Sequence, residues 1–388
     1  MKKMFTLLAA LAICLTINAQ TTKTMSWGGE TRSYLEYVPS SYNSQTPAPV
    51  LFVLHGLGDN MSNMFTSTGF KAIADQHGWI VITPQALEAS ISLMGQTMSI
   101  GTAWNSGVSA TFLTSNIIIN DGVDDSGLMM AILDDLIDNY NVDQSQVFAT
   151  GFSMGGFMAN RLGIEHGDRI TAIASVSGTV GNELKNNTPT GNVSAMHIHG
   201  TADGTVGYEN ADFNVGISVS VGLGAEATVD FWRNFNQCSA TPVVTNYPDN
   251  TNDGLTFEKY LYTNGTNDTK TAFIKVNGGD HTWYYTPAND IDYTTEIYNF
   301  FVSCTSSGIS ENESNVAVYP NPACNVLNVE SEAGSQIFIY NMAGQKVMNI
   351  ETADANESIN ISSLAEGVYV VRVVNGNAVS NTKVSVVR

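Results

Sequence analysis

A serine flanked by glycines stands near the middle of the chain. Gly151, Ser153 and Gly155 form the pattern G-x-S-x-G, which presents a serine hydroxyl on a tight turn between a strand and a helix. An apolar run at 147–150 precedes the turn, and a helical pattern at 154–166 follows it. A glycine-rich turn without chemistry is the alternative, but this context favours a nucleophile that attacks a carbonyl carbon.

A serine hydroxyl needs a base that removes its proton, and the chain holds six histidines. Five of them fall at predicted helix ends, within a predicted strand or at a strand end: His77, His166, His197, His199 and His55. His281 alone lies in a late loop that follows a strand. Because hydrolases with this serine turn carry serine, acid and histidine in that chain order, we expect His281 to be the base.

The acid that orients this imidazole should follow a strand between Ser153 and His281. Asp203 does so, in the turn His199-Gly200-Thr201-Ala202-Asp203 after the predicted strand 194–199. The alternatives are less well placed: Asp280, Asp212 and Asp230. The sequence therefore predicts the triad Ser153, Asp203 and His281.

Two further groups would complete such a site. The negative charge that develops on the carbonyl oxygen needs two backbone donors, for which we expect the N–H groups of Met154 and Leu57. Leu57 lies in the glycine turn His55-Gly56-Leu57-Gly58, which could also be a plain strand end. Trp104 and Trp283, with Tyr284 and Tyr285, are expected to line a substrate pocket, because flat rings stack on flat substrates; core packing or a surface patch is the alternative.

Alternating strands and helices must position these residues. Between residues 24 and 304, short apolar runs alternate with amphipathic segments. The runs read as strands at 50–54, 79–83, 147–150, 170–176, 194–199 and 271–276, and the segments as helices at 65–77, 124–140, 154–166, 225–237 and 291–302. This order predicts an α/β fold of the α/β-hydrolase type, with a mostly parallel central sheet covered by helices on both faces.

The two ends of the chain differ from this domain. Residues 1–19 carry Lys2 and Lys3 before an apolar run and read as a secretory signal peptide, with a lipid anchor at Cys14 as the alternative. The expected α/β domain spans 20–304, and a linker at 305–314 leads to a small all-β sandwich at 315–388. No histidine lies in that last part, so it holds no Ser-His-acid site of its own.

Charge and cysteine content restrict the setting. The 388 residues include 36 acidic and 16 basic side chains, for a net charge of −20. This balance argues against nucleic acid and anionic membrane as partners, and no later segment is long and apolar enough to span a membrane. Export permits disulfides, so we expect Cys238 to pair with Cys304, with free thiols as the alternative. We expect no metal and no organic cofactor.

Several spaced motifs carry a family resemblance. They are His55-Gly56-x-Gly58, Trp104-Asn105-x-Gly107, Val123-Asp124-Asp125, Gly151-x-Ser153-x-Gly155-Gly156, His199-Gly200-Thr201-Ala202-Asp203 and His281-Thr282-Trp283. Together they resemble secreted esterases of the polyhydroxybutyrate-depolymerase and feruloyl-esterase type, over most of residues 30–303. The resemblance implies the same nucleophile, acid and base. Asp280 departs from it, since such esterases usually have glycine directly before the histidine.

The tail resembles a second family. Val318-Tyr319-Pro320-Asn321-Pro322, Ile339-Tyr340-Asn341-Met342-Ala343-Gly344 and Gly367-Val368-Tyr369-Val370-Val371 are similar to motifs of the sorting domain of the bacterial type IX secretion system. This implies the secretion machinery as a partner, export across the outer membrane, and release or attachment at the cell surface.

The sequence thus predicts a secreted serine carboxylic ester hydrolase that works through an acyl-enzyme. Expected substrates are polymeric or plant-derived esters, namely feruloyl or acetyl polysaccharide esters or a polyhydroxyalkanoate-like polyester. An aromatic polyester of the polyethylene terephthalate type is the alternative substrate. Two different functions stay open, namely an acyltransferase with the same triad and a non-catalytic carbohydrate-binding surface protein.

Overall fold

The computed structural model describes residues 20–93, 95–112, 115–214, 218–305, 316–341, 345–350, 354–375 and 378–388. The expected signal peptide and nearly all of the expected linker lie outside these residues. The chain divides into two compact units, 1–305 and 306–388, and each is described by itself.

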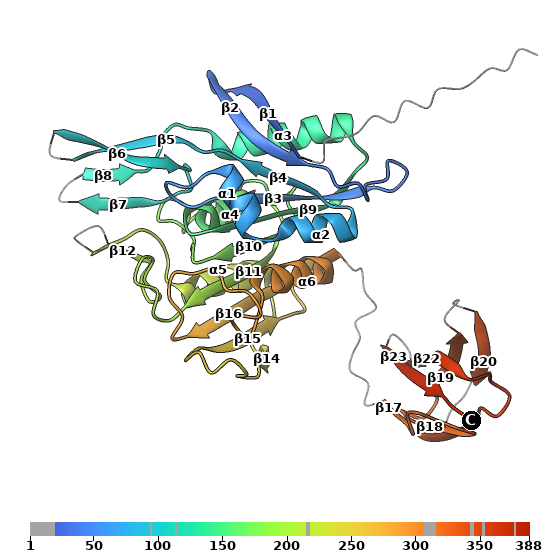
Figure 1. Ribbon diagram of the computed structural model, residues 1–388. Coiled ribbons are helices and arrows are strands. Elements are labelled where there is room, and N and C mark those ends of the chain that lie inside the picture. The colour runs from blue at the N-terminus through green and yellow to red at the C-terminus, as the bar shows by residue number, and fades with distance from the viewer. Residues whose placement is uncertain are drawn as a thin grey trace, which may run out of the picture. The chain divides into compact units, whose positions relative to one another are not determined.

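A ten-stranded sheet forms the centre of the first unit (Figure 1), in the order β1-β2-β4-β3-β9-β10-β11-β16-β15-β14. The strands are β1 (Gln20–Trp27), β2 (Glu30–Tyr37), β3 (Ala48–Leu54), β4 (Ile80–Pro84), β9 (Val142–Phe152), β10 (Ala172–Val176), β11 (Ser194–Gly200), β14 (Val243–Asn246), β15 (Thr256–Tyr262) and β16 (Thr271–Asn277). The six strands from β4 to β16 pair in parallel, and antiparallel strands flank them at both edges. The predicted α/β-hydrolase architecture is confirmed.

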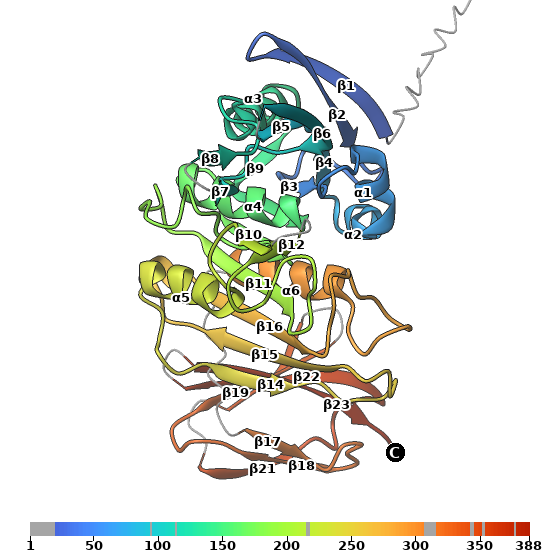
Figure 2. The ribbon, with the colours of Figure 1, turned by 90° about the vertical axis from the view of Figure 1, so that its left-hand side faces the viewer.

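Helices cover both faces of this sheet (Figure 2). Their bounds are α1 (Met61–Ser67), α2 (Phe70–His77), α3 (Asp125–Asn139), α4 (Met154–Glu165), α5 (Ala225–Asn236) and α6 (Tyr293–Thr305), and a 3-10 turn, η1, spans Thr266–Asp268. On β3, Val50, Phe52 and Leu54 pack toward α3 and α4, while Leu51 and Val53 pack toward α1, α2 and α6. The alternation follows from the two-residue period of a strand, and a strand buried on both sides reads as one continuous apolar run.

Three hairpins leave the sheet. They are β5 (Leu87–Leu93) with β6 (Gln96–Ala103), β7 (Ser109–Phe112) with β8 (Ser115–Ile118), and β12 (Asp212–Asn214) with β13 (Ser218–Ser220). The first two project together at the left of the first unit in Figure 1. Sequence patterns predicted no element in their place.

The second unit consists of two small antiparallel sheets. One has the order β17-β18-β21 and the other β20-β19-β22-β23. The strands are β17 (Ala317–Tyr319), β18 (Val326–Glu330), β19 (Gln336–Asn341), β20 (Lys346–Ile350), β21 (Asn356–Asn360), β22 (Gly367–Asn375) and β23 (Ala378–Val386). Leu327 and Val329 of one sheet share an apolar core with Ile337 and Val371 of the other, as expected for a sandwich.

Candidate active site

Ser153 lies on the sharp turn that joins β9 to α4. Its backbone has φ 55° and ψ −120°, a conformation that L-residues rarely adopt. A Cβ on Gly155 would lie 2.0 Å from the carbonyl oxygen of Leu54, and a Cβ on Gly151 would lie 2.3 Å from that of Gly155. Both glycines are therefore required by close backbone contact, which explains the G-x-S-x-G spacing.

The turn places the serine at the positive end of a helix. Ser153 caps α4 without a side-chain capping hydrogen bond, so its hydroxyl is not engaged with the first turn. Its own N–H donates to the carbonyl of Val176 at 2.8 Å. The first N–H groups of a helix have no acceptor within the helix, and the helix dipole favours negative charge beside them.

The predicted acid and base are hydrogen-bonded to each other. His281 Nδ1 lies 2.8 Å from Asp203 Oδ2, and Asp203 Oδ1 accepts from the N–H groups of Thr205 and Val206 at 2.9 and 2.8 Å. Burial acts to raise the pKa of Asp203, but His281 and the other donors outweigh it and hold this pKa below its ordinary value. The carboxylate is thus ionised at neutral pH and accepts the imidazole proton.

Backbone contacts join the loops that carry these two residues. Asp203 follows β11 and His281 follows β16, which are parallel neighbours, so both loops leave the same edge of the sheet as the serine turn. Ala202 N–H donates to the carbonyl of Gly279 at 2.8 Å. A Cβ on Gly200 would lie 2.2 Å from the Gly279 oxygen, so this approach requires glycine.

The serine turn meets the base and the first glycine turn at this edge. The ring of Phe152, directly before Ser153, lies 4.8 Å from the His281 ring. A Cβ on Gly56 would lie 3.5 Å from Ser153 Cβ. The structure therefore brings the three predicted catalytic residues and the predicted oxyanion turn to one edge of the sheet.

His55 fixes the orientation of that glycine turn. Its Nε2 accepts from the N–H of Ala86 at 3.1 Å, so its Nδ1 carries the proton and donates to the Gly56 carbonyl at 2.7 Å. In a trans peptide the carbonyl and the following N–H point in opposite directions, so the N–H of Leu57 points away from His55. The Gly58 N–H donates to the Thr102 carbonyl on β6 at 2.8 Å. This arrangement leaves the N–H of Leu57 as a candidate oxyanion donor.

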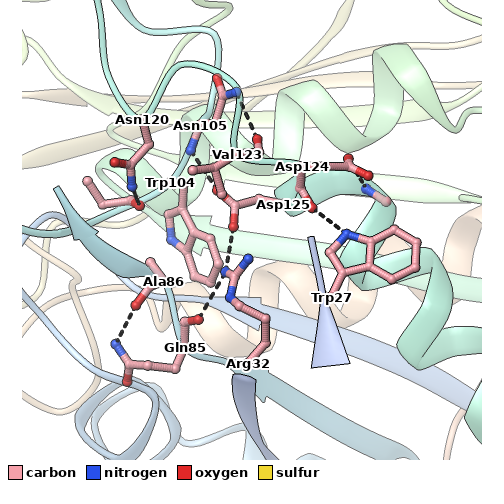
Figure 3. A network of polar contacts seen from close by, with 12 residues as sticks. Trp27, Arg32, Gln85, Ala86, Trp104, Asn105, Asn120, Val123, Asp124 and Asp125 are labelled. Atoms are coloured by element: carbon pink, nitrogen blue, oxygen red, sulfur yellow. Dashed lines mark hydrogen bonds and ion pairs between the residues drawn. The ribbon is translucent and has the colours of Figure 1, made fainter. Parts of the chain in front are cut away.

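A buried polar network lies behind this turn (Figure 3). Arg32 Nη2 and Asp125 Oδ1 form an ion pair at 2.6 Å, and Asp125 Oδ2 accepts from the N–H of Asn105 at 2.7 Å. Arg32 also donates to the carbonyl of Gln85, and the side-chain amide of Gln85 lies 3.2 Å from His55 Nε2. The network connects β2, α3 and the segment between β6 and β7.

The structure corrects the prediction for Trp104. Its side chain is 0% exposed and donates from Nε1 to the carbonyl of His55 at 2.8 Å. Sequence patterns do not reveal that a distant backbone oxygen accepts this proton and that the ring is enclosed. Trp104 therefore supports the glycine turn and offers no surface to a substrate.

Trp283 is half-buried beside the site. Its ring meets those of Phe152 and Phe70 edge-on, with centroids 6.4 and 6.2 Å apart, and it follows His281 by two residues. It remains a candidate for substrate contact. Tyr285 is 57% exposed, whereas Tyr284 is buried.

The expected disulfide is absent from the structure. Cys238 and Cys304 are both free. Cys238 Sγ lies 3.6 Å from the carbonyl oxygen of Thr269 and 3.7 Å from Thr271 Oγ1. Burial raises the pKa of both thiols, so they lie in the protonated form. The prediction rested on both cysteines ending helical segments, which does not fix the direction of their side chains.

Neither a metal site nor a membrane-spanning helix is present in the described part of the chain. Those residues hold no group of three or more His, Cys, Asp or Glu side chains that could bind a metal ion. Of the helices that the structure describes, none combines the length and the apolar character needed to cross a bilayer.

Comparison with known protein families agrees with this architecture. Residues 40–214 match the phospholipase/carboxylesterase family, and residues 317–387 match the secretion system C-terminal sorting domain. The first match contains the serine turn and Asp203, and the second covers the strands of the second unit.

Individual relatives are esterases. The chain is 26% identical to the putative esterase NocK of Nocardia uniformis subsp. tsuyamanensis, over 66% of this chain and 71% of that protein. It is 27% identical to the bifunctional acetylxylan esterase/xylanase XynS20E of Neocallimastix patriciarum, over 64% of this chain and 30% of that protein. It is also 27% identical to the probable feruloyl esterase C of Aspergillus terreus, over 38% and 47%. The chain thus spans less than half the length of the last two.

One solved structure shows the same fold. The acetyl xylan esterase from Aspergillus awamori superposes with a TM-score of 0.50 at 14% identity, over 73% of this chain and 99% of that one. Residues 40–214 are thus similar to carboxylesterases, in a unit with the α/β-hydrolase fold, and residues 317–387 are similar to a sorting domain that indicates type IX export to the medium or the cell surface.

Proposed function

We propose that the protein is a serine carboxylic ester hydrolase with Ser153 as nucleophile, His281 as base and Asp203 as the acid that orients it. The observation that carries the proposal is the 2.8 Å hydrogen bond between His281 Nδ1 and Asp203 Oδ2 beside a serine in a strained strand-to-helix turn. Such strain is maintained mainly at functional sites.

The proposed reaction has two steps. Ser153 Oγ attacks the ester carbonyl carbon while His281 Nε2 takes the hydroxyl proton. The tetrahedral intermediate collapses, the C–O bond to the alcohol breaks, and His281 returns the proton to the leaving oxygen. Water then attacks the acyl-enzyme with the same base, which releases the carboxylic acid and restores the Ser153 hydroxyl. Asp203 stabilises the imidazolium in both steps.

The negative charge on the carbonyl oxygen would be held by two backbone donors, the N–H groups of Met154 and Leu57. Met154 opens α4 directly after the nucleophile. The orientation of the Leu57 N–H is supported by the hydrogen bond from His55 to the preceding carbonyl. Donors fixed in this way need no reorganisation as the charge develops.

We infer that the substrates are polymeric or plant-derived esters, with acetylated or feruloylated polysaccharide first. The support is that relatives carry the names acetylxylan esterase and feruloyl esterase. The β5–β6 hairpin and the segment after it add a physical argument: Glu88 is the one charged residue between positions 87 and 120, which suits an uncharged polymer. The half-buried Trp283 ring would contact the acyl group.

The test is hydrolysis by the purified mature protein of acetylated xylan, methyl ferulate, polyhydroxybutyrate and polyethylene terephthalate. Ser153→Ala should abolish turnover and fluorophosphonate labelling, while Ser62→Ala, at an exposed serine on α1, should retain both. Adding an alcohol acceptor separates hydrolysis from acyl transfer. Turnover by Ser153→Ala would refute the assignment of the nucleophile, and inactivity of the wild type on all four esters would refute the proposed substrate class.

We also propose that residues 1–19 are removed as a signal peptide and that 305–314 is a linker. The exported protein should begin at or near Gln20. Intact mass and N-terminal sequencing of protein from the culture medium would check this, and a retained N-terminus would contradict it.

A further inference from the structure

Two histidines lie behind the proposed acid and take no part in the mechanism above. His197 and His199 are on β11, two residues apart and therefore on one face of the sheet. Their side chains are 2% and 0% exposed. A buried polar ring needs hydrogen-bond partners, and those partners lead to Asp203.

The contacts form one chain. Ser175 Oγ lies 2.8 Å from His197 Nδ1, and His197 Nε2 lies 3.1 Å from His199 Nδ1. His199 Nε2 lies 2.8 Å from the carbonyl oxygen of Val206 and 3.4 Å from Asp203 Oδ2. Ser175 and His197 are direct cross-strand neighbours on β10 and β11, so the sheet register sets the first contact.

The acceptors fix where each proton lies. A carbonyl only accepts, so His199 Nε2 carries a proton that it donates to Val206. Burial lowers the pKa of both histidines, so both rings are neutral and His199 Nδ1 is a bare acceptor. His197 Nε2 must then donate to it, and His197 Nδ1 accepts from the Ser175 hydroxyl. Every donor in this series of hydrogen bonds, from Ser175 to His199, points toward the loop of Asp203.

The elements around this chain leave few other charges near it. Phe273 of β16 stacks on His197 with ring planes 11° apart, and the Tyr208 ring meets His199 edge-on. Beyond Tyr208, Glu226 of α5 accepts hydrogen bonds from Tyr208 and from Lys275 of β16. The titratable groups that face the histidines are therefore Tyr208, Asp203 and His281. Lys275 is the direct cross-strand neighbour of His199, and its ammonium group lies over the Tyr208 ring and donates to Glu226.

We propose that His199 is a positioning residue for the catalytic acid, with its tautomer set by the Val206 carbonyl and matched by the donor on His197. Its Nε2–H holds the carbonyl of Val206, and the N–H of that same residue donates to Asp203 Oδ1. The imidazole also lies against Oδ2, the oxygen that faces His281. A neutral donor fixes the carboxylate without placing a second cation beside the base. The proposal rests on the triad of the proposed function.

The test compares two unbranched replacements of similar volume. His199→Met removes the donor, and His199→Gln keeps an N–H donor at the end of the side chain. For His199→Met we expect kcat on a nitrophenyl acetate to fall about 10- to 100-fold with KM within about twofold, because small displacements of catalytic groups cost rate. The acidic limb of the kcat/KM profile, which reports the catalytic base, should move by about half a pH unit or more. His199→Gln should recover at least part of both losses.

Matched controls separate positioning from stability. Met196→Ala, on the opposite face of β11, should lower the melting temperature while kcat and the pH profile of the folded enzyme stay unchanged. If His199→Met does not fold, His199→Asn replaces it, since its shorter side chain keeps a polar group for His197 but does not reach Val206.

The outcomes are distinct from those for the triad. A folded His199→Met or His199→Asn enzyme with wild-type kcat and an unmoved acidic limb would overturn the role of His199, while loss of activity in Ser153→Ala would still support the triad. Activity retained by Ser153→Ala would instead refute the triad itself. If His199→Met lowers kcat without moving the acidic limb of the kcat/KM profile, and Met196→Ala lowers kcat equally, the positioning role would also be overturned.

Discussion

Replacing Ser153 with glycine should make the protein more stable and inactive. The backbone there has φ 55° and ψ −120°, and a residue held in such a region costs about 1–3 kcal/mol because its Cβ crowds the backbone. Ser153→Gly removes the Cβ, and the side chain makes no capping hydrogen bond that would be lost. The greater freedom of glycine in the unfolded chain offsets about 0.5–1 kcal/mol. The expected net gain in the free energy of unfolding is about 0.5–2 kcal/mol.

Ser153→Ala is the matched control, because it removes the hydroxyl and keeps the Cβ and therefore the strain. Both variants should lose esterase activity. For a unit of this size, about 1 kcal/mol corresponds to about 2–4 °C in melting temperature, so Ser153→Gly should melt about 1–8 °C above Ser153→Ala.

Differential scanning calorimetry of the mature protein, with the hydrolase unit identified by its larger unfolding enthalpy, would measure this difference. Urea titration followed by tryptophan fluorescence gives an independent free energy of unfolding. Equal melting temperatures for the two variants would refute the reasoning, since the turn would then hold no strain that glycine relieves.

Three other substitutions test the groups around this turn. Gly155→Ala places a Cβ 2.0 Å from the carbonyl oxygen of Leu54, so it should cost about 1–3 kcal/mol of stability and most of the activity. Urea unfolding and ester assays would measure both losses, and a stable, active variant would contradict the close contact. The pKa of Asp203 is lowered on folding, so its ionised form stabilises the protein at any pH above the ordinary pKa near 3.8, and this contribution is lost as the pH falls through the lower pKa of the folded state. Asp203→Asn should therefore be less stable than wild type at pH 7, and the difference should shrink below about pH 4. A difference that does not depend on pH would disprove this. Arg32→Ala leaves the Asp125 carboxylate buried and without its ionic partner, which should lower the free energy of unfolding by about 3–5 kcal/mol. Urea titration would measure this, and a loss below about 1 kcal/mol would rule out an ion pair that is shielded from water.

The sequence allowed prediction of features that depend on local pattern. Continuous apolar runs marked the buried strands, and the glycines around Ser153 marked the turn, because close backbone contacts there admit no side chain. Asp203 could be selected because it follows a strand that also ends at the catalytic edge. The structure brings it to His281 as this reasoning requires.

Features that depend on distant partners were not predictable. The sequence predicts a pocket position for Trp104, yet its indole N–H donates to a backbone oxygen of His55. The expected helix at 65–77 is two helices, α1 and α2, because Gly69 between them adopts φ 73°. The hairpins β5–β6 and β7–β8 had no sequence signal, since their short polar and apolar runs lack turn residues in a regular pattern.

The position of the β5–β6 hairpin suggests how substrate choice could change without loss of catalysis. The proposed triad lies on loops that leave the central sheet, whereas the β5–β6 hairpin contacts the site by hydrogen bonds to the glycine turn that carries Leu57. Gly58 N–H donates to the Thr102 carbonyl, and Thr102 Oγ1 donates to the Asp59 carbonyl at 2.5 Å. Thr102 and Gly101 hold the turn in place, since a Cβ added to Gly101 would lie 3.0 Å from Gly58 Cα. The outer part of the hairpin can therefore vary with the substrate. We therefore expect changes near Thr102 to alter kcat through the proposed oxyanion turn, and changes at the tip of the hairpin to alter KM.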